Sequence, residues 1–554
     1  MAVGFAPGAP NPIPVTAAQP HDKPNEPWEL RFSRFVNEGG ETGAHNLTGG
    51  VGQRGAGITI AHLDTGYTLH PELMHGGRVR TQDARTFTDP APSYLSLKNL
   101  PSYLEQTLNV HIGAGIVVTS NSVQITAGAS ARVVFPDNGI DMLLGLNPSH
   151  GCSTASLFMS PVAVPPATNP GNNPPQYPVT APQVAEGLGA NRIDIIGTAP
   201  EAQYLPVRVT DSVMVDPIVA NNMATGLRYI LDKAKTDSSI GVISISLGMA
   251  AGEALKYAVI EQAIGAVADA GIIVCAAAGQ TVEGHHSLFE GWAQTAESLA
   301  GTANQGSAAA QEAARVARIV EVVADFTGLA LGSSYPTMKA LCDDLVAKAK
   351  AAGRSAQEIA RYLRFLELLL ANEARAARII GGPAYPGSDI NTICCAACDV
   401  HGNPLNTGLY GIEVDITSPG VQTFSARSVL NGQGGVDHFV HRSDGTSYAT
   451  AITAGACALW QAHHGRQNLI TRFGKHLMVH AFRWALKHSA ATQTVTGAQA
   501  PWDAARRGFG MLDAAALLQV QLPANANLLI EALHNEGVID VVTRARLRTL
   551  SNLN

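Results

Sequence analysis

Short apolar runs alternate with helix-like stretches along much of the chain. ITIAHL (58–63), VISISL (242–247) and IIVCAAA (272–278) are β-rich or continuously apolar, as expected for strands buried on both faces. Between the last two runs, apolar side chains recur at helical spacing: Leu255, Val259, Ile260, Ile264 and Val267. A strand, a helix and a second strand in this order form a βαβ unit. The pattern therefore predicts an α/β fold with a mainly parallel central sheet.

Two segments interrupt this order. Residues 99 to about 140 alternate apolar and polar positions around a Ser-Asn turn, which predicts a β-rich insertion. Residues 285–382 are rich in Ala, Glu and Leu and predict an inserted bundle of about four helices, in which SAQE (355–358) has the form of a capping box and Gly353 stands at a helix end. We expect a main domain at 28–521, preceded by a Pro-rich tail (1–27) and followed by a C-terminal extension (522–554).

Composition excludes several classes of protein. The 554 residues are 46% hydrophobic and 15% charged, so the chain can bury a large core. Its net charge of −7 lacks the basic excess that attracts phosphate backbones, and nucleic acid is not an expected partner. The apolar stretch 258–279 carries Glu261 and Asp269, which argues against a membrane span. With neither a secretory signal nor a folded pro-domain visible, a cytoplasmic location is expected.

The cysteines and one glycine-rich motif carry no predicted chemistry. Seven cysteines are an odd number, and most stand in apolar or small-residue runs, which indicates buried thiols in a reducing compartment. CCAAC (394–398) contains one C-x-x-C, but no second pair follows at zinc-like spacing. GGVGQRG (49–55) precedes a strand, whereas a dinucleotide-binding fingerprint follows a strand and opens a helix.

Three polar residues stand at the ends of predicted elements. Asp64 ends the first strand, His150 opens a helix-like run, and Ser447 lies between a Gly-Thr pair and a run of small residues. Each has a structural explanation by itself: an Asx turn, a surface residue and a helix cap. A serine nucleophile, however, needs a base, and the base needs a carboxylate that fixes its tautomer. The order Asp, His, Ser supplies all three, in one of the known arrangements of that triad.

In these motifs the chain resembles the subtilase family of serine peptidases. The matching stretches are DTG (64–66) followed by HPEL (70–73), HG (150–151) with Cys152 in place of the usual threonine, and GTSYATAITAG (445–455) with Ala451 in place of the usual proline. Further family-like blocks follow in the family's order: GTAPEAQYLPVRV (197–209), SISLG (244–248), AYPGSDINTICCAACD (384–399), VDITSPG (414–420) and GFGMLDAAAL (508–517). The resemblance covers roughly residues 28–518 outside the insertions and implies a subtilisin-like three-layer fold.

The resemblance also implies roles for individual residues. Ser447 would attack a peptide carbonyl, His150 would take and return its proton, and Asp64 would orient His150. Gln280 follows AAAG, where the family usually carries an asparagine whose amide donates to the oxyanion, and glutamine keeps that donor on a longer stem. The residues expected to line the substrate cleft are Ser246, Leu247, Gly248, Ala277, Ala278 and Gly279.

The function predicted from this resemblance is a serine endopeptidase that acts through an acyl-enzyme intermediate on a peptide or protein substrate. Two alternatives stay open: a catalytically weakened subtilase that binds peptides, favoured by Gln280 and Cys152, and an acyl-transfer (transpeptidase) relative. The chemistry requires no cofactor. Structural calcium is common in the family, but the scattered Asp and Asn residues form no spaced set of oxygen ligands. Oligomeric state and metal ligands are not predicted.

Overall fold

The structure is a computed structural model that describes residues 28–88, 137–160, 195–248, 258–280, 316–377, 383–430, 436–492 and 507–552, apart from short gaps inside these ranges. The predicted tail (1–27) and nearly all of the β-rich insertion (99–140) lie outside the described residues, as does the first part of the helical insertion.

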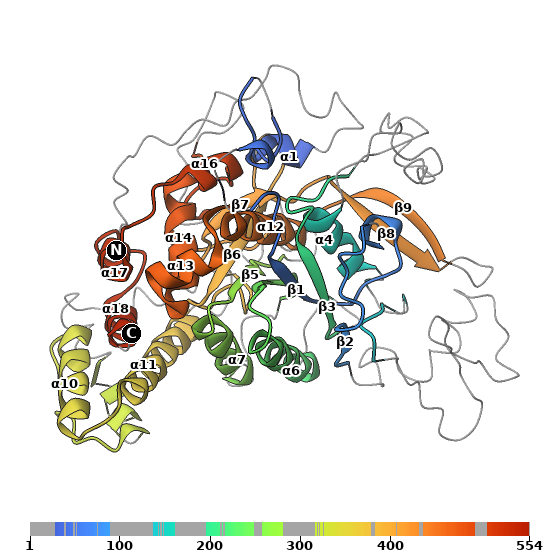
Figure 1. The fold of residues 1–554 in the computed structure, drawn as a ribbon. Coiled ribbons are helices and arrows are strands. Elements are labelled where there is room, and N and C mark those ends of the chain that lie inside the picture. Colours follow the sequence, from blue (N-terminus) through green and yellow to red (C-terminus); the bar gives the residue numbers. More distant parts are fainter. Residues whose placement is uncertain are drawn as a thin grey trace, which may run out of the picture.

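A seven-stranded parallel sheet forms the centre of the molecule (Figure 1). Its strands, in spatial order, are β2 (Arg85–Thr86), β3 (Gln203–Arg208), β1 (Thr59–Asp64), β4 (Ile240–Ile245), β5 (Ile273–Ala277), β6 (Thr392–Cys398) and β7 (Ile416–Pro419). The three apolar runs form β1, β4 and β5, and the helix between the last two is α7 (Ala258–Asp269). The predicted βαβ unit and the α/β fold with a parallel sheet are therefore confirmed.

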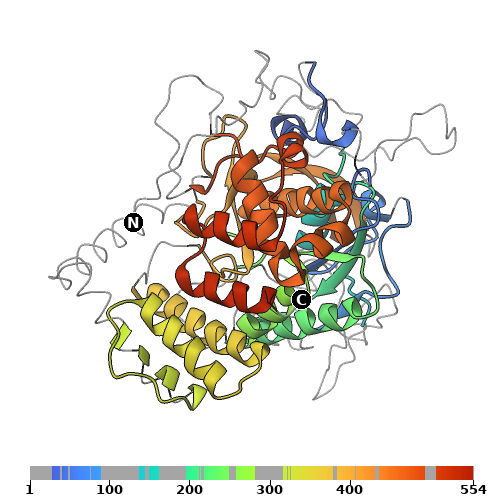
Figure 2. The same cartoon turned by 60° about the vertical axis from the view of Figure 1, so that its left-hand side comes forward.

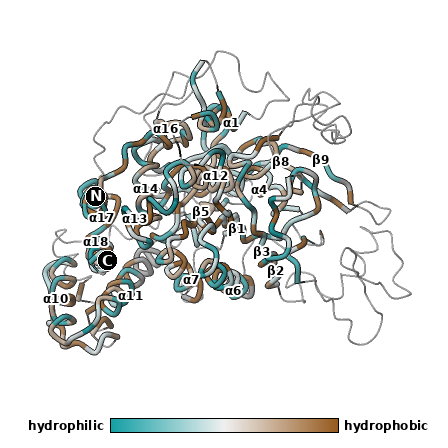
Figure 3. The backbone as a smooth tube through the Cα atoms, in the orientation of Figure 1, coloured by the Kyte–Doolittle hydropathy of each residue, from teal (hydrophilic) through white to brown (hydrophobic). Residues whose placement is uncertain are grey.

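Helices cover both faces of this sheet. On one face lie α6 (Pro217–Ala234) and α7; on the other lie α4 (His150–Met159), α12 (Thr446–His464) and α14 (Met478–Ser489). The side chains of β1 alternate between these layers: Ile60 packs with α4 and α12, whereas Ala61 and Leu63 pack with α6 and α7. Strand β5, with the sequence IVCAA, is correspondingly hydrophobic (Figure 3). The smaller helices are α1 (Trp28–Phe32), η2 (Ala44–Asn46), α2 (Pro71–Met74), α13 (Arg466–Phe473), η5 (Lys475–Leu477) and α16 (Ala514–Gln519).

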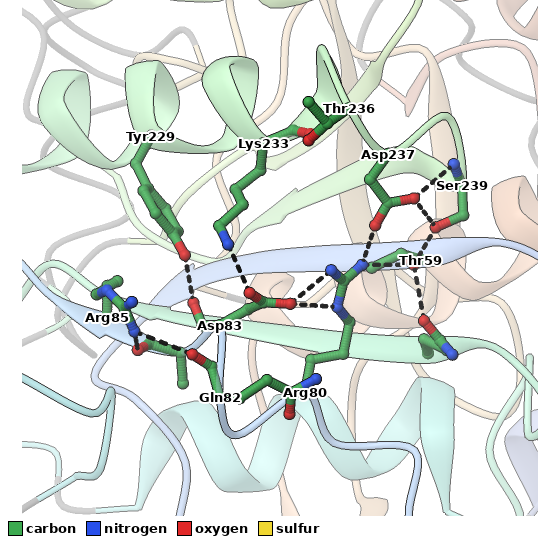
Figure 4. A network of polar contacts seen from close by, with 12 residues as sticks. Thr59, Arg80, Gln82, Asp83, Arg85, Tyr229, Lys233, Thr236, Asp237 and Ser239 are labelled. Carbon is green, nitrogen blue, oxygen red and sulfur yellow. Dashed lines mark hydrogen bonds and ion pairs between the residues drawn. The ribbon is translucent and has the colours of Figure 1, made fainter.

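An ion-pair network fixes the amino-terminal edge of the sheet (Figure 4). Arg80 bonds Asp83 at 2.6 Å and also pairs with Asp237, just beyond the end of α6. Lys233 of α6 binds the other carboxylate oxygen of Asp83 at 2.5 Å. The guanidinium of Arg80 also lies 3.4 Å from the hydroxyl of Thr59, the first residue of β1. The network thus anchors α6 at the end of β1 opposite to Asp64.

An antiparallel hairpin that the hydrophobic pattern does not indicate packs on α4. Its strands are β8 (Thr423–Leu430) and β9 (Val436–Ser443). The backbone N–H of Ala426 donates to the hydroxyl of Ser156 at 2.9 Å, and that of Ser428 donates to the hydroxyl of Ser149 at 2.7 Å. Because Ser149 immediately precedes α4, the hairpin holds the start of this helix.

The described part of the helical insertion contains α10 (Met338–Ala351) and α11 (Ala356–Ala377). The capping box is confirmed: the hydroxyl of Ser355 accepts from the Glu358 N–H at 3.3 Å, and the Glu358 carboxylate accepts from the Ser355 N–H at 2.8 Å. Gly353 has a φ of +70° just after α10, as predicted for a residue that ends a helix.

The C-terminal extension completes the core of this insertion. It contains α17 (Ala526–Asn535) and α18 (Val541–Ser551), and α18 lies beside the two insertion helices (Figure 2). Their shared core includes Leu341, Leu345, Leu363, Leu366 and Val542, all fully buried. Helix α18 of the extension and the two insertion helices therefore form one helical module, whereas the buried side chains of α17 belong to the main core.

All seven cysteines are described, buried and free of disulfide bonds, as the sequence analysis expected. In the same described ranges, no helix is both long and apolar enough to cross a membrane. Those ranges also contain no group of three or more His, Cys, Asp or Glu side chains arranged to hold a metal ion.

Candidate active site

Asp64 and His150 are joined by a short hydrogen bond. The Nδ1 atom of His150, the first residue of α4, lies 2.7 Å from Oδ1 of Asp64, the last residue of β1. The backbone N–H of Thr65 donates to the same oxygen at 2.7 Å. Burial alone raises the pKa of Asp64, but the charge and hydrogen bond of His150, helped by His62, hold that pKa well below its usual range. The Asp64 carboxylate is therefore ionised at neutral pH and fixes the His150 ring.

A second carboxylate, which the sequence analysis missed, connects the segments that carry these two residues. Asp141 accepts hydrogen bonds from the hydroxyl of Thr65 at 2.7 Å and from the backbone N–H of Ser149 at 2.9 Å. The hydroxyl of Thr65 in turn accepts from the Gly151 N–H at 3.0 Å. Asp141 thus joins the loop after β1 to the start of α4. No local motif marks this role, because Thr65 is 76 residues away in the sequence.

Ser447 lies in the first turn of α12, beyond the carboxyl end of β4. Its hydroxyl donates to the carbonyl of Ser246 at 3.1 Å, and the hydroxyl of Ser246 donates to the carbonyl of Ser447 at 3.0 Å. The neighbouring Tyr448 ring lies 6.3 Å, centroid to centroid, from the ring of His150. Ser447 and His150 are both among the described residues, and no hydrogen bond joins their side chains. The structure therefore brings Asp64 and His150 into contact and orients the Ser447 hydroxyl toward Ser246.

Thr446 connects the start of α12 to the loop that carries Gln280. The hydroxyl of Thr446 accepts from the Gly279 N–H at 3.2 Å, and the Thr446 N–H donates to Oε1 of Gln280 at 3.3 Å. The Gln280 side chain is exposed. Because its carbonyl oxygen is held by Thr446, its amide N–H groups face away from that bond. Thr446 belongs to the GTS motif, but the motif alone does not indicate that this residue anchors the Gln280 loop.

The expected substrate-binding residues lie where β4 and β5 end at the carboxyl edge of the sheet. Leu63 of β1 pairs with Ile245, and Ile245 pairs with Ala276, so the three strands end at the same level. The buried members of the set are Ser246, Leu247, Ala277 and Ala278, and the partly exposed members are Gly248 and Gly279. A peptide at this edge would therefore meet backbone groups and glycines more than side chains.

In comparisons with known proteins, the chain is similar to solved structures at low sequence identity. No protein-family model matches the chain, and no curated protein matches it. Among solved structures, it is similar to MycP1 with the N-terminal propeptide removed, at 14% sequence identity and a TM-score of 0.41, with 90% of this chain and 99% of that chain covered. A protease structure from Pseudoalteromonas arctica gives 14% identity, a TM-score of 0.41, and 90% and 98% coverage.

A third similar structure is fervidolysin from Fervidobacterium pennivorans, a keratinolytic enzyme related to subtilisin. It shares 13% identity at a TM-score of 0.42, with 92% of this chain and 48% of that chain covered. The α/β fold with a mainly parallel central sheet that the sequence predicts is present in the structure itself.

Proposed function

We propose that the protein is a serine endopeptidase in which Asp64, His150 and Ser447 form the catalytic triad. The observation that carries this proposal is the 2.7 Å hydrogen bond between Asp64 and His150 at the sheet edge where Ser447 lies in the first turn of α12. An ionised, buried carboxylate on one ring nitrogen of a histidine is the arrangement that prepares the other nitrogen to act as a base.

The positions of the protons in the site define the first step of the proposed mechanism. Since Nδ1 of His150 donates to Asp64, its Nε2 carries the free lone pair. Ser447 donates to the Ser246 carbonyl in the resting arrangement. Rotation about its Cα–Cβ bond would redirect the hydroxyl toward Nε2, which takes the proton as Oγ attacks the peptide carbonyl. Asp64 stabilises the imidazolium that results, and His150 then returns the proton to the leaving amine.

Two groups are suited to stabilise the negative oxygen that forms. The backbone N–H of Ser447 belongs to the first turn of α12, where helix amides lack an acceptor within the helix. The Gln280 amide is anchored by Thr446 at the same helix start. Donors fixed before the reaction require little reorganisation in the transition state, which makes such groups effective.

The geometry of the sheet edge favours an extended peptide as substrate. Ser246–Gly248 and Ala277–Gly279 follow or end two parallel strands, and their exposed atoms are mainly backbone and glycine. An extended chain can pair its own N–H and C=O groups with such an edge, which gives affinity with little dependence on side chains.

A fluorophosphonate probe tests this proposal, because it labels only an activated serine. The wild type should be labelled and should cleave casein, and Ser447→Ala should do neither. Mass spectrometry of peptide products with and without an added amine distinguishes hydrolysis from acyl transfer.

A catalytically silent, peptide-binding subtilase is the second candidate function. It is favoured by the hydrogen bond that directs the Ser447 hydroxyl to Ser246 instead of His150. A folded wild type that the probe does not label, but that binds extended peptides, would replace the proposed peptidase with this candidate.

A further inference from the structure

A second histidine lies against the carboxylate that orients His150. His62 stands two residues before Asp64 on β1, so both side chains project from the same face of the sheet. His62 is 1% exposed, and its Nε2 lies 3.3 Å from Oδ2 of Asp64. The other carboxylate oxygen, Oδ1, already accepts from His150 and Thr65. Within the described part of the chain, Oδ2 has no hydrogen-bond partner of standard geometry, which leaves His62 as the polar group that faces it.

The groups around His62 indicate which of its two ring nitrogens carries the proton. Its Nε2 faces the ionised carboxylate of Asp64, where an N–H is attracted and a bare lone pair is repelled. The same Nε2 lies 3.2 Å from the hydroxyl of Thr154, which can donate its own hydrogen to the His150 carbonyl at 3.0 Å. The Thr154 oxygen can then accept from His62. Nδ1 of His62 is buried and has no partner among the described residues. The arrangement therefore favours a proton on Nε2.

We propose that His62 is a positioning residue for the Asp64–His150 pair. Its Nε2–H faces both Asp64 on β1 and Thr154 on α4, and so connects the two elements that carry the pair. The rings of Phe158 and Tyr204 lie 5.6 and 6.0 Å from the imidazole and restrict its rotation. At 3.3 Å the contact is longer than a typical charge-assisted hydrogen bond, so its role is to hold the plane of the carboxylate. The role in catalysis rests on the proposed function.

Two substitutions of similar length test this role. His62→Gln keeps an amide donor near the position of Nε2, whereas His62→Met fills the space without a donor. We expect kcat to fall about tenfold or more in His62→Met with KM unchanged, because a loosened carboxylate misplaces the base and leaves peptide binding intact. His62→Gln should stay within about threefold of the wild type, a barrier change below ~1 kcal/mol. A folded Met variant with wild-type kcat would show that His62 only fills the core.

A spectroscopic measurement separates this proposal from the proposed function. The proton between His150 Nδ1 and Asp64 Oδ1 should give a low-field ¹H resonance, whether or not the protein hydrolyses peptides. This resonance should persist in His62→Gln and should shift or broaden in His62→Met. An unlabelled wild type in the fluorophosphonate assay overturns the peptidase but leaves this comparison valid. An unchanged resonance in a folded Met variant overturns the positioning role.

The tautomer of His62 can be measured in the wild type, without any substitution. In ¹⁵N NMR of the wild type, Nε2 of His62 should be the protonated nitrogen. A proton on Nδ1 with a bare Nε2 would overturn the proposal even if neither variant folds.

Discussion

Gly151 lies against Gly66 so closely that a Cβ atom on Gly151 would come within 2.1 Å of the Gly66 carbonyl oxygen. The contact joins the loop after Asp64 to the first turn of the helix that starts at His150. Gly151→Ala must push the two segments apart, so we expect a loss of about 1–3 kcal/mol in stability, as for other overpacked sites. The pair Asp64–His150 should separate as well. Urea unfolding and fluorophosphonate labelling measure the two effects.

Gly265 provides the matched control for this substitution. It lies inside α7, and a Cβ there would meet Arg364 at an ordinary 3.5 Å. Alanine is the better helix former, so Gly265→Ala should raise stability by roughly 0.5–1 kcal/mol and leave labelling unchanged. If Gly151→Ala behaves like Gly265→Ala, the close approach does not position the site.

Gln280 is the proposed oxyanion donor, and it stands where the subtilase motif usually has an asparagine. Gln280→Ala should lower kcat on the order of 10² to 10³ with little change in KM, because the donor acts mainly on the transition state; this range comes from subtilisin itself. Steady-state kinetics on a peptide substrate measure the change. Activity within about threefold, less than ~1 kcal/mol, would remove Gln280 from the mechanism.

Gln280→Asn tests whether the loop is adapted to the longer glutamine side chain or whether glutamine lowers the activity of the site. In the structure, Thr446 holds Oε1 of Gln280 at 3.3 Å. Asparagine is one methylene shorter, so it should lose this anchor unless the loop moves. We therefore expect kcat to fall in Gln280→Asn. A rise in kcat would instead mean that glutamine detunes the site.

The strands of the sheet could be predicted because both of their faces are buried. The β-rich or continuously apolar runs in the sequence match β1, β4 and β5 to within two residues. The β8–β9 hairpin was missed for the opposite reason. Ser425 and Ser428 are fully buried in β8, where hydrogen bonds replace apolar packing, so the hydrophobic pattern is interrupted.

The residues of the candidate site also divide into those that the sequence indicates and those that it does not. Asp64, His150 and Ser447 stand in short motifs that the sequence displays directly. Asp141 and His62 are not marked in this way, because their importance comes from contacts between segments: Asp141 meets Thr65, 76 residues earlier in the chain. Such a contact exists only once β1 and α4 are packed together. The sequence therefore indicates the groups that we propose to react, but not the groups that hold them.

Glu29 should make stability depend on pH. Burial raises the pKa of this carboxyl to about 8, although backbone hydrogen bonds at Glu29 and Phe424 and the charge of Arg442 lower it. The folded state thus binds a proton that the unfolded state releases above about pH 4.5. The stabilisation from this group is complete below that pH and is lost as the pH rises toward 8.

The matching measurement is urea unfolding of the wild type and Glu29→Gln between pH 5 and 8. Glu29→Gln carries no titrating proton, so its stability should exceed that of the wild type increasingly with pH, by up to about 1.4 kcal/mol per pH unit. The control is Glu41→Gln, since Glu41 is exposed. Parallel pH curves for the wild type and Glu29→Gln would mean that Glu29 is ionised in the folded protein at neutral pH.

Arg546 should be the main anchor of the helical module on the sheet. This buried residue of α18 donates to Glu367 of α11 at 2.8 Å and to Asn391, next to β6, at 3.2 Å. Arg546→Met leaves the Glu367 carboxylate buried with one partner fewer. We expect a loss of roughly 3–5 kcal/mol in unfolding free energy, the usual effect of breaking a buried pair.

A double-mutant cycle decides whether this loss belongs to the pair. Arg546→Met combined with Glu367→Met removes both charges of the pair, while Arg364 loses Glu367 but keeps Asp389 at 3.5 Å. The double change should therefore be less destabilising than the sum of the single changes. Arg544→Met is the control, because Arg544 pairs with the more exposed Glu531 and should contribute below about 1 kcal/mol. Additive effects of Arg546→Met and Glu367→Met would mean that Arg546 and Glu367 stabilise the protein independently of each other, and that their ion pair does not anchor the module.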